Sequence, residues 1–156
     1  MKKIRFYLDT TIFNFAFADD VPERKRHTLK FIDALPSIAE DIYISDEVNI
    51  EISRASEPKR SKLRGVVEKL NPVLLEIDIE TVELAERYIK EGIIPLKYRS
   101  DAIHIAVAVT NGIQAIASWN FEHIVKLKTR VMVNGINRLL GYNDIEICSP
   151  EEVVEP

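Results

Sequence analysis

The chain has 156 residues, of which 46% are apolar and 29% are charged, and its formal net charge at pH 7 is −4. This composition is close to that of an average globular protein, so it excludes a disordered or a fibrous chain. The length allows one domain with a sizeable core and is too short for two ordinary domains. We therefore expect a single domain over residues 1–150, followed by a C-terminal tail over residues 151–156 that frays.

Short apolar runs alternate along the chain with longer segments of helical periodicity, as they do in βαβ units. We predict strands over residues 4–8, 41–45, 73–77, 115–119 and 145–148. Helices are predicted over residues 22–34, 46–54, 59–70, 81–91 and 100–110. The last of these helices is apolar on nearly every side, which indicates a central, buried position. The pattern predicts a three-layer α/β/α fold with a central, mostly parallel sheet of about five strands.

Cysteine usage and the lengths of the apolar runs indicate the compartment. The single cysteine, Cys148, cannot form a disulfide within the chain, which fits a reducing compartment. The N-terminus resembles no secretory signal, and the longest apolar stretch, residues 102–109, is far shorter than the ~20 residues of a membrane span. We expect a cytoplasmic protein without a membrane segment. No histidine stands at metal-ligand spacing with another or with Cys148, which excludes a zinc cluster.

Polar residues follow the predicted strands at the edge where ligands of open parallel sheets gather. Asp9 ends the first strand, Asp101 begins the helix before the fourth strand, and Asn120 comes directly after the fourth strand. Glu51 lies in the helix after the second strand, one turn beyond Val48, so it can point back over the sheet edge. We expect these four side chains to converge on one end of the sheet.

Each of the four residues also has a simpler interpretation. Asp9 and Asp101 can cap helices, since a carboxylate accepts the free N–H groups of a first helical turn. Glu51 can pair with Arg54 on the surface, and Asn120 can be a turn residue. Capping does not require all four to stand at the same edge, so their combination favours a shared site.

Four segments resemble, in order, those of the PIN domain family and of its VapC-like members, the ribonuclease toxins of type II toxin–antitoxin pairs. They are YLDTTIFN (residues 7–14), YISDEVNIEI (43–52), YRSDAIHIAVA (98–108) and SWNFEHIV (118–125), and they cover nearly the whole chain. The resemblance implies a metal-dependent endoribonuclease that hydrolyses RNA phosphodiester bonds. It places the family's acidic trio on Asp9, Glu51 and Asp101 as metal ligands and catalytic residues. It also implies a cognate antitoxin and a homodimer.

One position departs from the family pattern, because Asn120 stands where a fourth acidic residue is common. An amide can orient a metal-bound water but brings no charge, so we expect weaker activity or the use of one metal ion instead of two. We count Asn120 among the catalytic residues. A carboxylate cluster without Cys or His suits the hard cations Mg²⁺ or Mn²⁺, which activate water for phosphodiester hydrolysis.

Two other functions compete with this interpretation. A degenerate PIN domain that binds RNA or a partner without cleaving is favoured by Asn120. A phosphatase with Asp9 as nucleophile usually has a second acidic residue two positions later, where this chain has Thr11.

Several side chains near the four residues have secondary roles in this hypothesis. Thr10 or Thr11 can bond a metal-bound water, whereas His104 on an apolar helix is typical of a hydrogen-bonded core histidine. We expect His123 to contact RNA if it has a role, and Trp119 and Phe121 to pack in the core or stack on bases. Finally, we expect one of two basic segments, residues 59–64 or 126–130, to flank the site and guide RNA.

Overall fold

The computed structural model describes residues 2–155 and contains one five-stranded sheet. The strands are β1 (Ile4–Leu8), β2 (Ala39–Ser45), β3 (Val73–Leu75), β4 (Ala115–Ala117) and β5 (Glu146–Cys148). Their order across the sheet is β3-β2-β1-β4-β5, and every neighbouring pair is parallel. The predicted sheet is confirmed, and it is parallel throughout.

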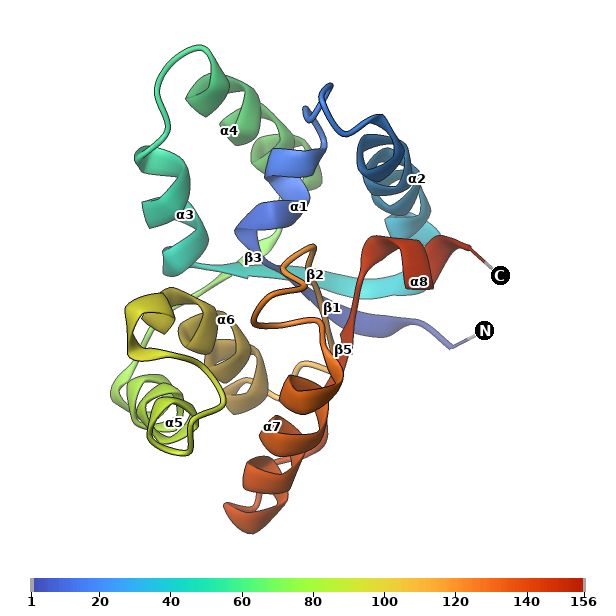
Figure 1. The fold of residues 1–156 in the computed structure, drawn as a ribbon. Coiled ribbons are helices and arrows are strands. Elements are labelled where there is room, and N and C mark those ends of the chain that lie inside the picture. The colour runs from blue at the N-terminus through green and yellow to red at the C-terminus, as the bar shows by residue number, and fades with distance from the viewer. Residues whose placement is uncertain (1, 156) are drawn as a thin grey trace.

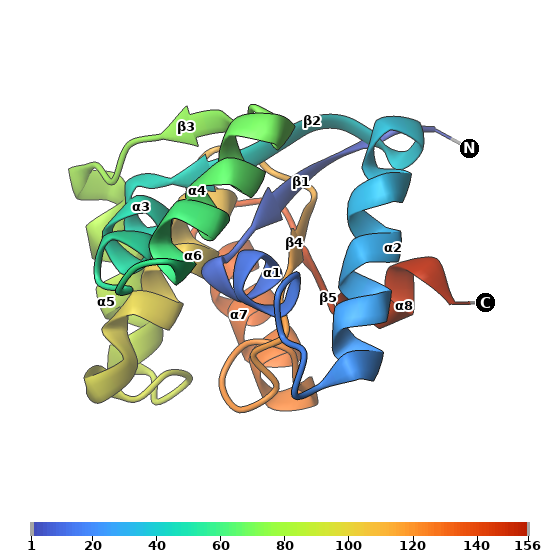
Figure 2. The same cartoon turned by 90° about the horizontal axis from the view of Figure 1, so that it is seen from above.

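Helices cover both faces of this sheet. They are α1 (Thr10–Phe15), α2 (Pro22–Ile38), α3 (Asp46–Ser53), α4 (Lys59–Leu70), α5 (Ile79–Lys90), α6 (Arg99–Thr110), α7 (Leu127–Leu139) and α8 (Pro150–Val154), with a 3₁₀ turn η1 (Leu96–Tyr98). In Figure 1, α1, α2 and α4 lie above the sheet and α5, α6 and α7 lie below it. Figure 2 shows the same layers from above, with α8 beside α2. The predicted three-layer α/β/α fold is therefore confirmed.

The strand order creates one position where ligands are expected. The chain runs outward from β1 through β2 to β3, and then returns to the opposite side of β1 to form β4 and β5. Helical connections therefore leave β1 and β4 toward opposite faces, which opens a crevice between their carboxyl ends. Leu8 pairs with Ala117 at this edge. Asp9 follows Leu8 and Ser118 follows Ala117, so these two residues meet at this crevice, which is the topological switch point of the sheet.

The core lies on both sides of β1 and is closed below by α6. All residues of α6 from Ala102 to Val109 are buried, as its apolar sequence predicted. α6 packs against β4 and α5, so it has no solvent-facing side that would require polar residues. Among residues 2–155, no helix is both long enough and apolar enough to cross a membrane.

Several predicted boundaries are wrong. Predicted strand residues 76–77, 118–119 and 145 lie outside the strands, whereas β2 begins at Ala39 instead of residue 41. The backbone N–H of Trp119 bonds to Thr11 Oγ1, and that of Ile145 to Asn134 Oδ1, so these groups do not join the strand ladder. The helix predicted to end at residue 34 continues to Ile38 with Pro36 inside it.

The structure also adds helices where the sequence predicted none. α7 was not predicted. The fraying predicted from residue 151 is wrong for Glu151–Val154, which belong to α8. The Ser149 hydroxyl caps α8 by accepting the N–H of Glu152, and the helix packs on α2. These contacts order a segment that is too short to be a stable helix alone.

Candidate active site

Asp9 links the carboxyl ends of β1 and β4. It is the N-cap of α1, where its Oδ1 accepts the backbone N–H of Thr11 at 3.0 Å and the Thr11 hydroxyl at 2.5 Å. Its Oδ2 accepts the hydroxyl of Ser118, just after β4, at 2.5 Å. The side chain is buried, and burial raises the pKa of Asp9 despite the opposing effects of His104, Ser118 and Thr11. Asp9 is therefore both a helix cap and a buried carboxyl group at the switch point.

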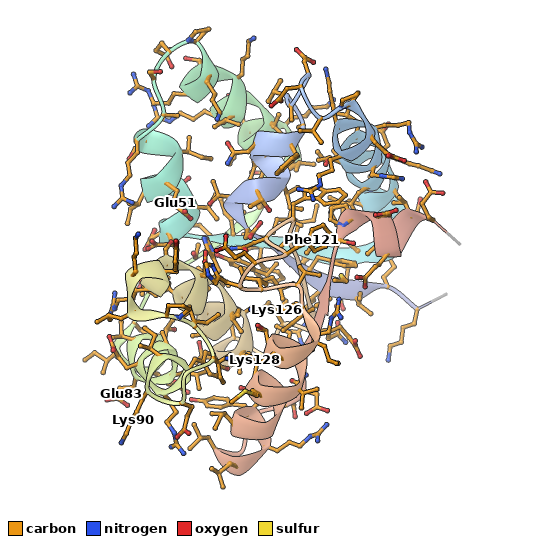
Figure 3. All side chains as sticks on the ribbon, viewed as in Figure 1. Glu51, Glu83, Lys90, Phe121, Lys126 and Lys128 are labelled. Carbon is orange, nitrogen blue, oxygen red and sulfur yellow. The ribbon has the colours of Figure 1, made fainter. Side chains whose placement is uncertain are left out.

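Glu51 reaches the same region from α3 (Figure 3). Its Oε1 accepts the Thr10 hydroxyl at 2.8 Å and lies 2.5 Å from Nε2 of His104. Burial opposes ionisation of this carboxyl group, but the hydrogen bonds from His104 and Thr10 outweigh it and lower the pKa of Glu51. The alternative surface pair with Arg54 does not form among the described residues.

His104 holds Glu51 through a chain of buried polar groups. Its Nδ1 lies 2.7 Å from the hydroxyl of Tyr7, which lies 2.8 Å from the hydroxyl of Ser45 at the end of β2. Burial by itself lowers the pKa of His104, but the hydrogen bond to Glu51 and the charge of Asp9 raise it above its ordinary value. The opposite pKa shifts of Glu51 and His104 describe one partly buried ion pair that joins α3 to α6.

Asp101 and Asn120 form a second group at this edge. Asp101 lies in the first turn of α6, and its Oδ2 is 3.0 Å from Nδ1 of His123. Asn120 Oδ1 accepts the backbone N–H of His123 at 2.9 Å, and the Asn120 N–H donates to Ser118 Oγ at 2.9 Å. Burial raises the pKa of Asp101, although the side chains of Asn120, His104 and His123 oppose this rise.

The structure thus places all four predicted residues at the carboxyl edge of the sheet. Hydrogen bonds join Asp9 to Asn120 through Ser118, and Glu51 to α6 through His104. Buried carboxyl groups with raised pKa values favour a nearby cation, and oxygen donors of this kind suit Mg²⁺ or Mn²⁺. Within residues 2–155, however, no three His, Cys, Asp or Glu side chains are arranged to hold a metal ion. The donor set fits such an ion in its chemistry, and ligation remains a proposal.

Some residues of this network have roles that the sequence did not predict. Ser118 was given no role, and Tyr7 was assigned only to a strand. His104 is indeed a hydrogen-bonded buried histidine, but it bonds Glu51, and His123 bonds Asp101. Ser118 lies directly after β4, but the predicted fourth strand extended to residue 119, so the sequence contained no signal for its contact with Asp9.

A groove leads away from Glu51 between α1, α3 and α4. One cavity of about 290 Å³ is lined by Glu51, Arg54 and Lys59, and a second of about 420 Å³ is lined by Lys59 and Lys62. Both cavities are lined by Asn14 and Lys59, so they adjoin each other beside α1. Among residues 2–155, no carboxylate lies within ion-pair distance of Arg54, Lys59 or Lys62. Arg60, by contrast, pairs with Glu57.

Two cations of the second basic segment, Lys128 and Arg130, are engaged within the protein. Figure 3 shows Lys126 and Lys128 on the side of the molecule that carries α7. Lys128 donates to the carbonyl of Gly92 at 3.0 Å, and Arg130 pairs with Glu152 at 3.1 Å. Of the two predicted segments, the one in α4 therefore lies next to Glu51 with free charges.

Taken together, these features define an α/β protein with a carboxylate-rich site at the switch point of a parallel sheet. The family model of the PIN domain matches residues 6–123, which include Asp9, Glu51, Asp101 and Asn120. The chain belongs to the PIN domain family, and the resemblance predicted from the four segments is confirmed.

Solved structures with this fold come from toxin–antitoxin systems. VapBC2 from Rickettsia felis, bound to a promoter DNA fragment, matches with a TM-score of 0.56 at 14% identity over 94% of this chain and 98% of that chain. VapBC-5 from Mycobacterium tuberculosis gives 0.54 at 16% identity over 94% and 98%. VapC20 from the same organism, a Sarcin-Ricin loop cleaving toxin, gives 0.52 at 14% identity over 90% and 98%. At these identities the likeness concerns the fold. A sequence comparison with curated proteins gives no match.

Proposed function

We propose that the protein is a metal-dependent endoribonuclease and the toxin of a toxin–antitoxin pair. The observation that carries the proposal is the position of Asp9, Glu51 and Asp101 at one sheet edge of a PIN domain. Burial raises the pKa of Asp9 and Asp101, so both carboxyl groups gain from a bound cation. VapC20, which shares the fold, is a Sarcin-Ricin loop cleaving toxin.

Asp9, Glu51 and Asp101 would hold Mg²⁺ or Mn²⁺ in this proposal. The ion would supply a lowered pKa of a bound water and charge stabilisation at the scissile phosphate. The chain's own residues hold the carboxylates in place, because Ser118 and Thr11 fix Asp9 and His104 fixes Glu51. Asn120 contributes a neutral amide, which can orient a water without adding charge to the site.

We include partners and compartment in the proposal. Two of the structural neighbours are VapBC complexes bound to DNA, which supports a cognate antitoxin for this chain. We further propose a homodimer in the cytoplasm, where a lone cysteine stays reduced. Light scattering of the purified chain measures the dimer directly, and a monomer at micromolar concentration contradicts it.

Cleavage of purified RNA by the parent chain and by Asp9→Asn tests the enzyme. We expect Mn²⁺- or Mg²⁺-dependent cleavage that EDTA abolishes. Asp9→Asn should lower the rate on the order of a hundredfold or more, because outer-sphere changes already cost 10- to 100-fold. Asp33→Asn, an exposed carboxylate on α2, is the matched control and should cleave at the parent rate.

The competing functions correspond to other results of the same experiment. A parent chain that binds RNA but cleaves none with either metal is the non-catalytic PIN module, for which the amide of Asn120 is the supporting feature. The phosphatase has less support, because both carboxylate oxygens of Asp9 already accept hydrogen bonds from Ser118 and Thr11. An Asp9→Asn variant with the parent rate would reduce Asp9 to a helix cap.

A further inference from the structure

An arginine on α2 is held against three aromatic rings beside the candidate active site. The guanidinium carbon of Arg24 lies 5.3 Å from the ring centroid of Phe15, 5.4 Å from that of Trp119 and 5.0 Å from that of Phe121. Trp119 itself is fixed, since its indole N–H donates to the Thr28 hydroxyl at 2.8 Å. The rings therefore hold the guanidinium in one place through cation–π contacts.

The charge of Arg24 has no counter-charge within the described residues. No carboxylate lies within 4.0 Å of its nitrogens, whereas on the same helix Lys25 pairs with Asp19 and Arg26 with Glu23. No side-chain nitrogen or oxygen in residues 2–155 is both buried and without a hydrogen-bond partner. Since the Arg24 nitrogens form no hydrogen bond, they must reach solvent. A positioned guanidinium thus presents free donors outward.

This cluster is adjacent to the carboxylate site along two routes. Trp119 follows Ser118, which bonds Asp9, and the Trp119 backbone N–H donates to Thr11 Oγ1 at 2.8 Å. Phe15 ends α1, which begins directly after Asp9, and a helix of six residues spans only about 9 Å. Phe121 is 40% exposed on the loop between β4 and α7, labelled in Figure 3. These connections place the Arg24 cluster beside the active site, so a polynucleotide bound there can extend to it.

We propose that Arg24 and Phe121 form a nucleotide subsite for single-stranded RNA, in which the guanidinium binds a backbone phosphate and the Phe121 ring stacks on a base. The proposal rests on the proposed ribonuclease function and deepens it. A planar fork of N–H donors matches phosphate oxygens, and a partly exposed ring accepts any base by stacking. An acidic protein segment could pair with the charge of Arg24 but would leave the exposed part of the Phe121 ring without a partner. RNA can contact both, so RNA is the favoured ligand.

Binding of a fluorescein-labelled, ten-nucleotide single-stranded RNA in EDTA tests the subsite without cleavage. Arg24→Gln should weaken binding roughly tenfold at 50 mM salt and lower the salt slope by about 0.7, the value for one phosphate contact on a single strand. Arg24→Lys should restore the slope but not the full affinity, because the planar fork is lost. Phe121→Leu should weaken binding roughly five- to tenfold with an unchanged slope, as expected for lost stacking.

Arg26→Gln is the matched control on the same helix and should leave the affinity unchanged, because Arg26 is already paired. An Arg24→Gln variant with parent affinity and slope overturns the subsite, and a lowered melting temperature would then identify Arg24 as a structural clamp. Binding of a ten-residue polyglutamate peptide is measured in parallel. If Arg24→Gln weakens binding of this peptide but not of RNA, the site belongs to a protein partner. If the parent chain binds no RNA, both the subsite and the ribonuclease function are contradicted. If it cleaves RNA and Arg24→Gln leaves the RNA affinity unchanged, only the subsite is contradicted.

Discussion

His104 connects the active-site carboxylates to the core through both ring nitrogens. Because a carboxylate can only accept, Nε2 donates to Glu51, and Nδ1 faces the hydroxyl of Tyr7. Burial raises the pKa of Tyr7 well above its usual value, so Tyr7 stays neutral and donates or accepts as the imidazole requires. The Tyr7–His104–Glu51 chain therefore stabilises a charged imidazole inside the protein.

The stability of His104→Gln should depend on pH relative to the parent chain. The folded pKa of His104 is raised, so the charged imidazole stabilises the fold fully below its ordinary pKa of ~6.5 and loses this effect as pH rises through the raised value. Glutamine can still donate to Glu51 but carries no charge. We expect a loss of roughly 1.5–3 kcal/mol at pH 6 that shrinks toward pH 9, measured by urea unfolding. A loss that is constant over this range would mean that His104 is neutral.

Asn120 lies where an added carboxylate would face Asp101. The Asn120 side chain opposes the rise in the pKa of Asp101 that burial causes. Asn120→Asp replaces this neutral amide with a like charge, so we expect a loss of roughly 1–3 kcal/mol in the absence of metal at pH 7. Mn²⁺ should reverse the loss if both carboxylates lie near the ion. Melting temperatures across a Mn²⁺ titration measure this, and an unchanged response to metal would place position 120 outside the metal site.

Among the elements, α4 contains a glycine that contributes nothing to packing. Gly65 is exposed in the middle of the helix, and a Cβ built on it meets no atom within 4 Å. Gly65→Ala should therefore raise the free energy of unfolding by roughly 0.5–1 kcal/mol, because alanine loses less backbone entropy on folding. Gly112, just after α6, has a φ of +66° and is the contrasting case. Gly112→Ala should destabilise the protein in the same urea titration.

The helices differ in how well their sequences specify them. α6 was predicted because its apolar run and the following Asn111-Gly112 signal act locally. α7 was not, since Gly135 and several β-branched and asparagine residues lower its helix propensity. Tertiary contacts hold it instead, such as the bond between Asn137 Oδ1 and the hydroxyl of Tyr88 at 2.5 Å. Local patterns do not contain such contacts.

The same distinction applies to the candidate site. The edge that carries Asp9, Glu51, Asp101 and Asn120 could be predicted, because parallel strands bring their carboxyl ends together. The partners of these residues could not be predicted, because they depend on distances between segments far apart in sequence. Ser118 is 109 residues from Asp9, and their bond exists only because β4 pairs with β1.

For the whole molecule, an acidic chain must still attract RNA. The net charge of −4 opposes binding of a polyanion at long range, so affinity depends on local positive potential. The groove along α1 supplies it, since Arg54, Lys59 and Lys62 line a path that begins at Glu51. In this arrangement the carboxylates at the end of the groove would act in cleavage, and the cations along the groove would bind the RNA strand.

Replacing two cations of this groove should weaken RNA binding through charge alone. If Lys59 and Lys62 each contact one phosphate, Lys59→Gln with Lys62→Gln should lower the salt slope by about 1.4, because a single strand contributes about 0.7 per contact. The double change Lys69→Gln with Lys90→Gln is the control, since it alters the net charge equally at exposed positions outside the groove. Binding of single-stranded RNA in EDTA between 50 and 200 mM salt measures both slopes. Equal slopes for the two double variants would show that RNA responds only to net charge and does not follow the groove.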